Sequence, residues 1–462
     1  MTIKIYMENV NSKIEGVPLL LAKKISKLLT FTVSGFGGSS ATCLYDLSNH
    51  ITHTGLIPRV IKFLHESKIK FEVIDKRVKP KQNANFKLME GFTMRDYQES
   101  IVNRSSSREI IQAATGAGKT FIMYCLAVKF NVKPLVVIAP KVSLAEQIKD
   151  EFEKFSGQKI GIIGGGYYDI QDITVCTPMS APRELLESAN MIMFDECHCI
   201  PSHSVFNTAA MAKNAYYRIG VSATPWRDGG DDLMIEAALS IRKPHLSLNA
   251  STLIEKEKLT PCSIVFVPYK KEFKWPGNYN DLYNQAIVNN EERNSIISTL
   301  AYKMLQKKRT TLILIKNIKH GDMLVENLRK KCDISCKVVK VNNQEVVVHS
   351  IDFLSGRDSK ERRKAVLNSV KEGFTKILIG STIADEGLDL SILDCLILAG
   401  GGKSSTRAFQ RIGRVLRLHP KKDNAIVFDI LDETKTFKRH ALTRKALYQT
   451  EPMWNIQTLQ TK

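Results

Sequence analysis

Short strand-like runs alternate with helix-like stretches through the middle of the chain. The strand-like runs lie at 109–112, 135–139, 173–176, 191–194 and 218–221. Strands that alternate with helices are typical of a parallel sheet with helices on both faces. Residues 89–246 are therefore predicted to form one α/β domain.

The same alternation returns in the C-terminal part of the chain. Its strand-like runs lie at 311–315, 346–349, 376–379, 395–398 and 425–428. We expect a second α/β domain over 247–462. The predicted fold class is therefore α/β, with two tandem parallel-sheet domains and a cleft between them.

The first 88 residues show a different pattern. Strand-like runs at 3–6 and 69–74 enclose helix-like stretches near 19–29 and 56–66 and a glycine-rich turn at 34–38. The polar stretch 79–85 resembles a linker. A small α+β domain is predicted over 1–88.

Charge changes the picture more than composition does. Hydrophobic residues make up 43% and charged residues 25%, as in ordinary globular proteins, but 67 Lys and Arg against 47 Asp and Glu give a net charge of +20. Such an excess favours a polyanion such as nucleic acid, although it could also serve solubility alone. In the N-terminal block, Lys23, Lys24 and Lys27 share one helical segment. They could grip duplex DNA or form a solvated face.

Cysteine usage and the apolar runs bear on location. The nine cysteines show no paired CxxC spacing, so a reduced compartment fits better than a zinc or disulfide framework. The N-terminus has no secretory core, and no apolar run approaches membrane-spanning length. We expect a cytoplasmic protein with no membrane association.

A phosphate-binding loop stands between a strand and a helix. Residues 113–120 read Ala-Ala-Thr-Gly-Ala-Gly-Lys-Thr. Glycines let backbone N–H groups turn toward phosphates, and the helix N-terminus favours negative charge. We expect Lys119 to reach the β- and γ-phosphates and Thr120 to bind Mg²⁺. The strict motif fails only at its first position, Ala113.

Two carboxylates end the apolar strand at 191–194. They are Asp195 and Glu196. Ligands of parallel sheets bind at this carboxyl edge. We expect Asp195 to hold Mg²⁺ and Glu196 to orient and deprotonate an attacking water. The two motifs together predict a nucleoside-triphosphate hydrolysis site.

The sequence Asp195-Glu-Cys-His198 is a DExH box, and the chain resembles superfamily 2 helicases and translocases. Their motifs occur in order at 95–98, 114–120, 139–144, 177–178, 195–198, 222–225, 380–389 and 410–417. The resemblance implies two RecA-like domains and ATP as the fuel. It also implies that ATP closes the cleft and hydrolysis reopens it, in inchworm steps.

The resemblance assigns roles to individual residues. Those implied to bind the nucleotide are Arg95, Gln98, Thr115, Gly116, Gly118, Lys119, Thr120, Gly387, Asp389 and Gln410. Gln98 would read adenine and Asp389 the ribose. Arg414 and Arg417 would act as arginine fingers from the second domain. Arg411, Arg414 and Arg417 are expected on one helical face.

Two further groups follow from the same likeness. Those implied to couple hydrolysis to movement are His198, Ser222, Ala223 and Thr224. Those implied to contact the nucleic-acid strand are Pro140, Lys141, Thr177, Pro178 and Thr382.

Within the superfamily, the chain resembles phage UvsW-type and T5-type branch-migration helicases, and also XPB-like and RecG-like enzymes. The shared features are a short basic N-terminal domain, Gly164–Gly166 after a strand, the Met-rich strand before Asp195, and Arg227-Asp228. Such relatives remodel forks and four-way junctions with 3′-to-5′ polarity. The likeness implies a monomer that acts on branched DNA, with replication or recombination proteins as possible partners.

Several alternatives stay open. The chain could be an RNA or RNA–DNA hybrid helicase that releases transcripts, a duplex translocase that does not unwind, or a binding protein with a vestigial ATPase. The intact Lys119, Asp195, Glu196 and Arg414 speak against the last. No strand-separating wedge is identified, and Trp275 is expected to be core at a domain boundary rather than a wedge.

Overall fold

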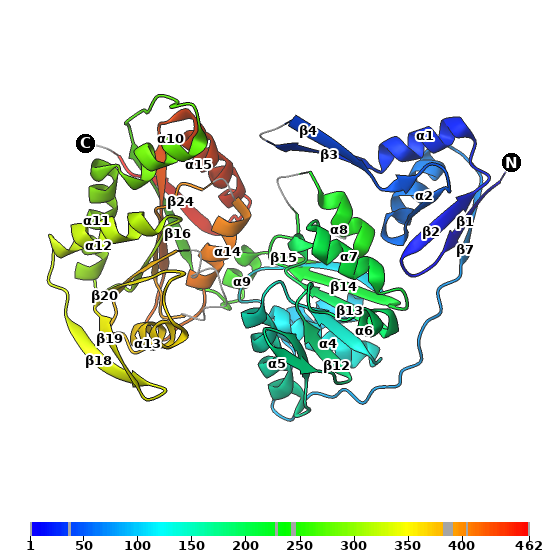
Figure 1. The fold of residues 1–462 in the computed structure, drawn as a ribbon, viewed down its shortest axis with the longest axis horizontal. Helices are drawn as coiled ribbons and strands as arrows, with labels where there is room; N and C mark the ends of the chain where they lie inside the picture. The colour runs from blue at the N-terminus through cyan, green and yellow to red at the C-terminus, as the bar shows by residue number, and fades with distance from the viewer. Residues whose placement is uncertain are drawn as a thin grey trace. The chain divides into compact units, whose positions relative to one another are not determined.

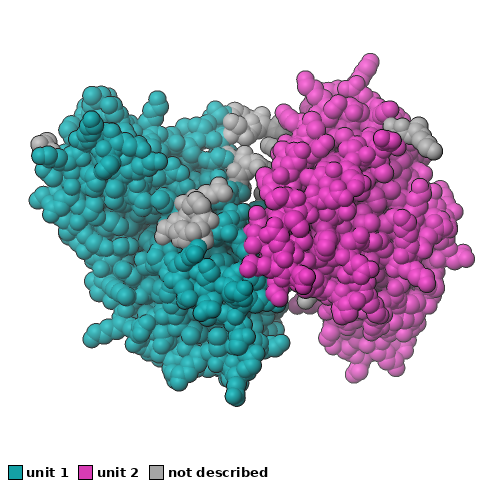
Figure 2. Space-filling view, turned by 180° about the vertical axis from the view of Figure 1, so that it is seen from behind, with its two compact units in different colours: residues 1–248 teal, residues 249–462 magenta. Residues whose placement is uncertain are grey.

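The chain folds into two compact units, residues 1–248 and 249–462, coloured teal and magenta in Figure 2. The structure is a computed structural model that describes residues 2–35, 38–226, 230–241, 246–381, 391–402 and 405–460. None of the helices in these ranges is long and apolar enough to cross a membrane. The division between the units falls two residues after the boundary that we expected.

The N-terminal region builds a mixed sheet covered by two helices (Figure 1). Its elements are β1 (Ile3–Met7), β2 (Asn11–Glu15), α1 (Leu19–Leu28), β3 (Thr30–Gly35), β4 (Gly38–Cys43), β5 (Tyr45–Asp46), β6 (Ile51–His53), η1 (Thr54–Leu56), α2 (Ile57–Glu66) and β7 (Phe71–Asp75). The sheet order is β5-β6-β2-β1-β7, and β3 and β4 form a separate hairpin. Only β1 and β7 pair in parallel. The small α+β domain is confirmed.

The rest of the first unit is a parallel sheet with helices on both faces. Its elements are α3 (Asp96–Arg104), β8 (Arg108–Ala113), α4 (Lys119–Phe130), β9 (Leu135–Ile138), α5 (Val142–Ser156), β10 (Gly161–Gly164), β11 (Tyr167–Asp169), β12 (Ile173–Cys176), α6 (Arg183–Ser188), β13 (Met191–Asp195), η2 (Cys197–Cys199), α7 (His203–Met211), β14 (Tyr217–Ser222), α8 (Asp232–Ala238) and β15 (Ser247–Leu248). The order is β11-β10-β12-β9-β13-β14-β8-β15, and only β11 runs antiparallel to its neighbour. The central strands are buried throughout, as expected for strands covered on both faces.

The N-terminal sheet shares a core with helix α8. Leu233 and Ala237 of α8 belong to the same buried cluster as Ile5, Ile25 and Leu56. A side chain at Gly55 would collide with the carbonyl oxygen of Glu236, at 2.0 Å from the added Cβ. The Glu236 carboxylate in turn accepts hydrogen bonds from Arg59. The N-terminal region is therefore packed onto the first parallel sheet rather than tethered to it.

Two buried arginines cap helices beneath this contact. Arg218, which is 1% exposed, donates to the carbonyls of Ala209, Ala212 and Ala238 at the C-terminal ends of α7 and α8. Arg108 donates to the carbonyls of Asn9, Ala238 and Leu239. Neither has a carboxylate partner among the described residues. The carbonyls and the negative ends of the two helix dipoles compensate the charges.

The second unit contains a second parallel sheet. Its elements are α9 (Ala250–Glu255), β16 (Cys262–Tyr269), α10 (Tyr279–Tyr283), η4 (Asn284–Val288), α11 (Glu291–Gln306), β17 (Thr311–Leu314), α12 (Ile318–Arg329), β18 (Cys336–Val341), β19 (Gln344–His349), β20 (Ile351–Leu354), α13 (Lys360–Lys371), β21 (Ile377–Gly380), β22 (Cys395–Leu398), α14 (Ser405–Val415), β23 (Ala425–Asp432), α15 (Lys435–Tyr448) and β24 (Trp454–Thr458). The order is β20-β21-β17-β22-β23-β16-β24, all in parallel. The predicted fold class of two tandem parallel-sheet domains is confirmed.

Two expectations about this unit are wrong. Residues 346–349 were expected in the parallel sheet, but β19 pairs only with β18 in a separate antiparallel hairpin. Asn342 and Asn343, with φ of 49° and 63°, form its tight turn. Trp275 was expected to be core, but it is 54% exposed in the connection between β16 and α10.

Candidate nucleotide and nucleic-acid site

The phosphate-binding loop connects β8 to α4 in the first unit. Gly116 and Gly118 have φ of 90° and 76°, a conformation that suits glycine. A Cβ at Gly118 would lie 2.6 Å from Nε2 of Gln98. Lys119 and Thr120 begin α4, where backbone N–H groups are unpaired. The loop therefore has the backbone shape that a phosphate cradle needs.

Gln98 lies against this loop rather than away from it. Its side chain is 4% exposed. Oε1 accepts a hydrogen bond from the backbone N of Arg95 at 3.0 Å, and Nε2 donates to the carbonyl of Ala117 at 3.0 Å. Arg95 also donates to the Tyr97 hydroxyl at 2.9 Å. The structure thus brings the 95–98 segment into contact with the loop.

Three predicted residues meet at the carboxyl ends of β13 and β14. The Ser222 hydroxyl donates to Oε2 of Glu196 at 3.0 Å, and Nδ1 of His198 lies 3.1 Å from the same hydroxyl. His198 Nδ1 also lies 3.2 Å from Oε2 of Glu196. Asp195 pairs with Val221 in the parallel register, so Glu196 and Ser222 follow at one level. Glu196 adopts the left-handed conformation, with φ of 49°.

The charges in this cluster shift one another's pKa. Burial raises the pKa of Asp195, and the negative charge of Glu196 raises it further, while Lys119 opposes both. Burial acts in the same direction on Glu196, but the hydrogen bond with His198 and the charge of Lys119 bring its pKa below the ordinary value. Burial disfavours the charged form of His198, yet hydrogen bonds with Cys199 and Glu196 raise its pKa. The shifts therefore favour the ionised form of Glu196 and the protonated form of His198 beside it.

The remaining predicted coupling residues follow Ser222 directly. The backbone N of Thr224 donates to the Ser222 hydroxyl at 3.2 Å. Ala223 is 3% exposed. The hydroxyl of Thr224 is buried and has no hydrogen-bond partner among the described residues. Arg227 and Asp228 lie outside the described residues.

The other half of the same sheet edge carries the predicted nucleic-acid contacts. Pro140 and Lys141 follow β9, and Thr177 and Pro178 follow β12. On the other side of β12, at the end of β10, lies Gly164, with φ of 127°, where a Cβ would stand 2.9 Å from the hydroxyl of Thr177. Because β9, β10 and β12 are parallel neighbours, these groups meet at one edge. The structure brings them together and places them beside the β13 and β14 cluster.

Most of the site residues predicted in the second unit lie outside the part of the chain that the structure describes. Thr382, Gly387 and Asp389 lie outside the described residues, as do the side chains of Gln410 and Arg414. Arg411 and Arg417 are described, and both are partly buried.

One helical expectation is wrong. Helix α14 ends at Val415, so Arg417 stands beyond it and does not continue the helical face. The physical reason is that other groups take the last carbonyls. Lys422 donates to the carbonyl of Val415 at 2.9 Å, and the backbone N of Thr260 donates to that of Leu416 at 2.8 Å.

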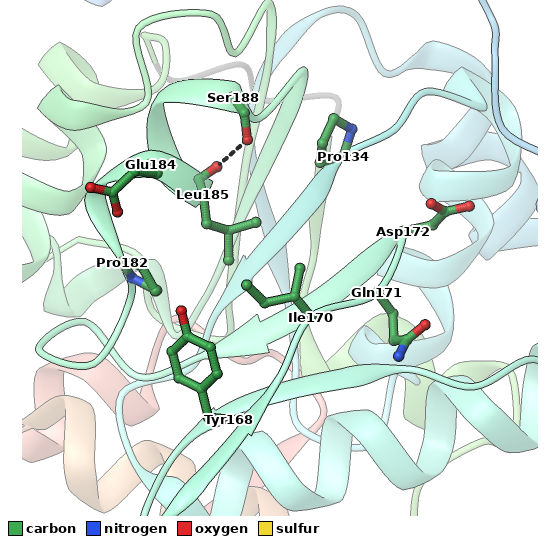
Figure 3. Close-up of a pocket in the computed structure, with 9 residues that line it drawn as sticks. All are labelled: Pro134, Tyr168, Ile170, Gln171, Asp172, Pro182, Glu184, Leu185 and Ser188. Atoms are coloured by element: carbon green, nitrogen blue, oxygen red, sulfur yellow. Dashed lines mark hydrogen bonds between the residues drawn. The ribbon is translucent and has the colours of Figure 1, made fainter.

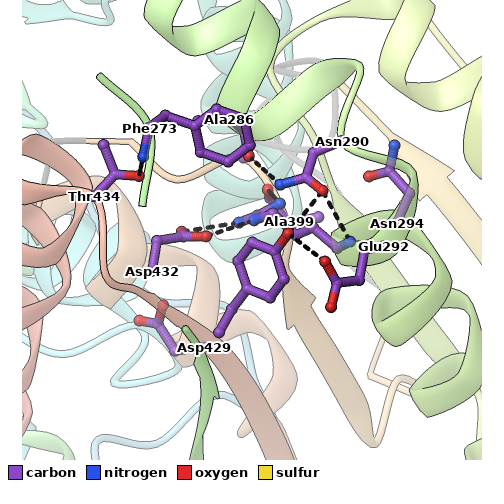
Figure 4. Close-up of polar contacts among 12 residues, drawn as sticks. Phe273, Ala286, Asn290, Glu292, Asn294, Ala399, Asp429, Asp432 and Thr434 are labelled. Carbon is purple, nitrogen blue, oxygen red and sulfur yellow. Dashed lines mark hydrogen bonds and ion pairs between the residues drawn. The ribbon is translucent and has the colours of Figure 1, made fainter. Parts of the chain in front are cut away.

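Sequence reasoning missed a buried polar network in the second unit, part of which Figure 4 shows around Asn290, Ala399 and Asp432. Arg293 pairs with Asp432, and Arg444 pairs with Asp429, all with 4% exposure or less. One available signal was the pair of carboxylates in the apolar strand 425–432, Asp429 in its middle and Asp432 at its end.

A separate hollow lies at the opposite edge of the first sheet (Figure 3). It encloses about 510 Å³, and Pro134 and Asp172 line it just before the starts of β9 and β12. Tyr168, Ile170 and Glu184 also line it. No residue predicted for the nucleotide or the strand lines this hollow, so it is distinct from the candidate site.

Two family models match the chain. Residues 91–227 match the family described as type III restriction enzyme, res subunit, and residues 306–419 match the helicase conserved C-terminal domain. The chain belongs to the superfamily 2 helicases. It is an ATP-dependent helicase enzyme that binds nucleic acid.

Individual relatives refine this placement. The helicase is 28% identical over 369 residues to the ATP-dependent DNA helicase uvsW of Enterobacteria phage T4, over 75% of this chain and 69% of that one. It is 26% identical over 419 residues to a probable helicase of Escherichia phage T5, over 86% of this chain and 85% of the other. The expected likeness to the UvsW and T5 types is confirmed.

A solved structure supports the fold alone. It is a fragment of a putative HsdR subunit of a type I restriction enzyme from Vibrio vulnificus. It matches 96% of this chain and 84% of its own, with a TM-score of 0.59 and 16% identity.

Proposed function

We propose that this helicase uses ATP to translocate on DNA with 3′-to-5′ polarity and to remodel forks and four-way junctions during phage-type replication, recombination or repair. The observation that carries the proposal is the carboxyl edge of the first parallel sheet. On that edge, the ends of β8, β13 and β14 carry groups suited to binding and hydrolysing a nucleotide. The ends of β9 and β12 carry groups suited to contacting a nucleic-acid backbone. The chain would work in the three parts 1–88, 89–246 and 247–462.

ATP and Mg²⁺ fit the residues present. Thr115, Gly116, Gly118 and Lys119 would surround the phosphates, and Gln98 with Arg95 would lie beside the adenine. Thr120 and Asp195 would hold Mg²⁺. The described residues contain no cluster of three or more His, Cys, Asp or Glu able to hold a metal. Two protein ligands suffice, because Mg²⁺ in such sites keeps its waters and binds substrate phosphates.

Hydrolysis would use groups from both units. Glu196 would accept a hydrogen bond from the attacking water and orient it, with His198 holding the carboxylate ionised. Arg414 and Arg417 would stabilise charge on the transferred phosphoryl group, with Gln410, Gly387 and Asp389 at the nucleotide. A site shared between two domains is complete only when they close, which ties hydrolysis to movement.

The Ser222 hydroxyl would transmit this change. It touches Glu196 and His198 at once, and Ala223 and Thr224 continue from it. Hydrolysis would consume the water held by Glu196 and remove the γ-phosphate, which would change the hydrogen bonds that Glu196 and Ser222 make. A single hydroxyl would thus link the hydrolytic water to the segment after β14.

DNA would be held mainly through its backbone. Hydroxyls and amides, as at Thr177, do not read bases, which suits a translocase. Thr382, Pro140, Lys141 and Pro178 would complete the grip. Lys23, Lys24 and Lys27 of α1 would contact duplex near the junction. With a net charge of +20, binding should weaken steeply with salt.

The test compares ATPase and strand release on single strand, blunt duplex, fork, four-way junction and RNA duplex at fixed salt. The expected result is strong stimulation and strand release on forked or four-way DNA. Stimulation by RNA would make it an RNA helicase. ATPase on duplex without strand release would make it a translocase. No ATPase on any substrate would contradict the proposal outright.

A further inference from the structure

Three buried side chains donate to the carbonyls of one short loop in the second unit. The loop, residues 399–402, follows β22 and precedes α14. Nη1 of Arg293 donates to the carbonyl of Ala399 at 2.8 Å. The Tyr283 hydroxyl donates to that of Gly400 at 2.9 Å, and Nη1 of Arg444 donates to that of Gly402 at 2.7 Å.

The three donors come from three different helices. Tyr283 ends α10, Arg293 lies on α11, and Arg444 lies on α15. All are buried, with exposures of 5%, 0% and 4%. A loop whose carbonyls are bound from three sides cannot shift without breaking buried hydrogen bonds.

The loop backbone passes close to neighbouring groups at two of its glycines. Gly401 has φ of 56°, and a Cβ there would lie 3.0 Å from Cδ1 of Ile287. A Cβ at Gly400 would lie 3.4 Å from the backbone N of Lys316. Gly400 and Gly401 therefore let the loop pass close to its neighbours.

Each arginine is held by a carboxylate on β23. Nε and Nη2 of Arg293 donate to Asp432 at 2.8 and 3.2 Å. Nε and Nη2 of Arg444 donate to Asp429 at 2.8 and 2.6 Å. In both arginines one edge of the planar guanidinium faces the carboxylate, and Nη1 is left to face the loop.

Stability alone does not explain this arrangement. Removing two charges from water is costly, and well-packed apolar side chains of similar volume often stabilise a core as well or better. A guanidinium held at two points offers something that apolar side chains lack, a donor with a defined direction. Here both such donors point at the same loop.

We propose that Tyr283, Arg293 and Arg444 are positioning residues that hold 399–402 and thereby set where α14 begins. They would place the arginines of α14 for catalysis without touching the nucleotide themselves. The inference rests on the proposed role of Arg414, and it identifies the buried side chains that would hold the helix carrying Arg414 in position.

Tyr283→Phe provides the sharpest test, because it removes one hydroxyl and keeps the ring. Tyr269→Phe is the matched control, since it removes a buried hydroxyl in the same unit that bonds Asn290 and Glu292 instead of the loop. For Tyr283→Phe we expect kcat of DNA-stimulated ATPase to fall about 3- to 10-fold, with KM for ATP within about two-fold. Tyr269→Phe should keep kcat within about two-fold. Equal effects of the two variants on kcat would overturn the inference.

Arg444→Lys is a second, harsher variant. A lysine keeps the charge beside Asp429 but lacks the planar fork that also reaches Gly402. We expect kcat to fall by at least about 10-fold in a protein that remains folded by circular dichroism. Near-normal kcat in the folded variant would contradict a positioning role.

Hydrogen exchange separates this inference from the proposed function. Amides in 399–402 and in the first turns of α14 should exchange about 10-fold faster in Tyr283→Phe than in Tyr269→Phe. If Arg414→Ala keeps normal turnover while this exchange difference is seen, the catalytic role of α14 is wrong and the loop contact stands. If the two tyrosine variants exchange alike, the loop contact itself fails.

Discussion

The two parallel sheets place their polar chemistry in opposite ways. In the first unit, Glu196, His198 and Ser222 stand directly at strand ends and touch one another. In the second unit, the charged groups Arg293, Arg444, Asp429 and Asp432 lie buried behind a loop, and the helix that carries the predicted arginines comes after that loop. A strand end positions a side chain by itself, whereas a loop needs outside donors to do so.

This difference separates reacting groups from supporting ones. A substitution in the first cluster removes a group that would meet the nucleotide or its water. A substitution in the buried network of the second unit removes no reacting group, and by the inference above it would change only where the arginines of α14 lie. The predictions below probe the two units in turn, from the largest expected effect to the smallest.

The largest effect is expected at Arg414. Arg414→Ala should lower kcat of DNA-stimulated ATPase by about 10³-fold or more, because an arginine finger compensates charge that develops on the phosphoryl group. Steady-state ATPase measures this. Arg439→Ala, on the exposed side of α15, is the matched control and should keep normal turnover. Equal turnover of the two variants would remove the second unit from the chemistry.

Glu196→Gln should lower kcat by about 10²- to 10⁴-fold while ATP still binds. The amide cannot accept the proton of the water or bind the cationic His198 as a carboxylate does. Equilibrium binding of a fluorescent ATP analogue together with single-turnover hydrolysis separates the two effects. Glu184→Gln, exposed in the same unit, serves as the control. Near-normal hydrolysis by Glu196→Gln would refute the assignment.

Ser222→Ala should separate hydrolysis from movement. ATPase should stay within about three-fold of normal, whereas strand release per ATP should fall about 10-fold, since the hydroxyl that joins Glu196 to His198 is lost. Ser188→Ala removes a hydroxyl that donates to the Leu185 carbonyl, away from this cluster (Figure 3). It should change neither quantity. A proportional loss of ATPase and strand release in Ser222→Ala would place Ser222 in the chemical step.

The smallest effect concerns stability at low pH. Burial, with Arg218 and Arg108 nearby, lowers the pKa of His53 from 6.5 to about 4. Between these values the unfolded chain binds a proton that the folded chain does not, so stability is lost as pH falls from about 6.5 to 4. The loss is at most about 3 kcal/mol.

Urea unfolding at pH 7 and pH 4.5 measures this loss in the wild type and in His53→Leu. The leucine variant should lose less stability on acidification than the wild type. His65→Gln, at an exposed position on α2, should behave as the wild type does. An unchanged pH dependence in His53→Leu would show that this histidine does not titrate as described.

The sequence allowed much of the first unit to be predicted because its signals are local. Met191–Asp195 is an apolar run that ends in a carboxylate, and every strand of this kind in a parallel sheet ends at the same edge. The glycines of the phosphate loop indicate positions where the backbone can adopt positive φ, as Gly116 and Gly118 do. The expectation that Ser222 is a coupling residue came from the family resemblance, and the parallel register of β13 and β14 is what brings Ser222 to Glu196 and His198.

What the sequence did not reveal depends on distant partners. The valine-rich segments of β18 and β19 indicate strands, but they do not indicate that the two strands pair only with each other. Arg218 reads as a surface charge until the ends of α7 and α8 are seen around it. The three donors to 399–402 are distant in sequence from the carbonyls they bind. The separations are 117 residues for Tyr283, 106 for Arg293 and 42 for Arg444. No local pattern carries such information.

Strand β14 has one further consequence. Its second residue is Arg218, whose guanidinium donates to the carbonyl of Ala238 at the end of α8, and its last residue is Ser222. From Arg218 to Ser222 the extended chain spans roughly 13 Å, and it pairs with a neighbouring strand, β13 or β8, on each side. Helix α8 also packs against the N-terminal sheet through Leu233 and Ala237. A displacement of that sheet would therefore be transmitted along β14 to Ser222 and Glu196. The N-terminal region is thus connected, through α8 and a single strand, to the cluster of Glu196, His198 and Ser222.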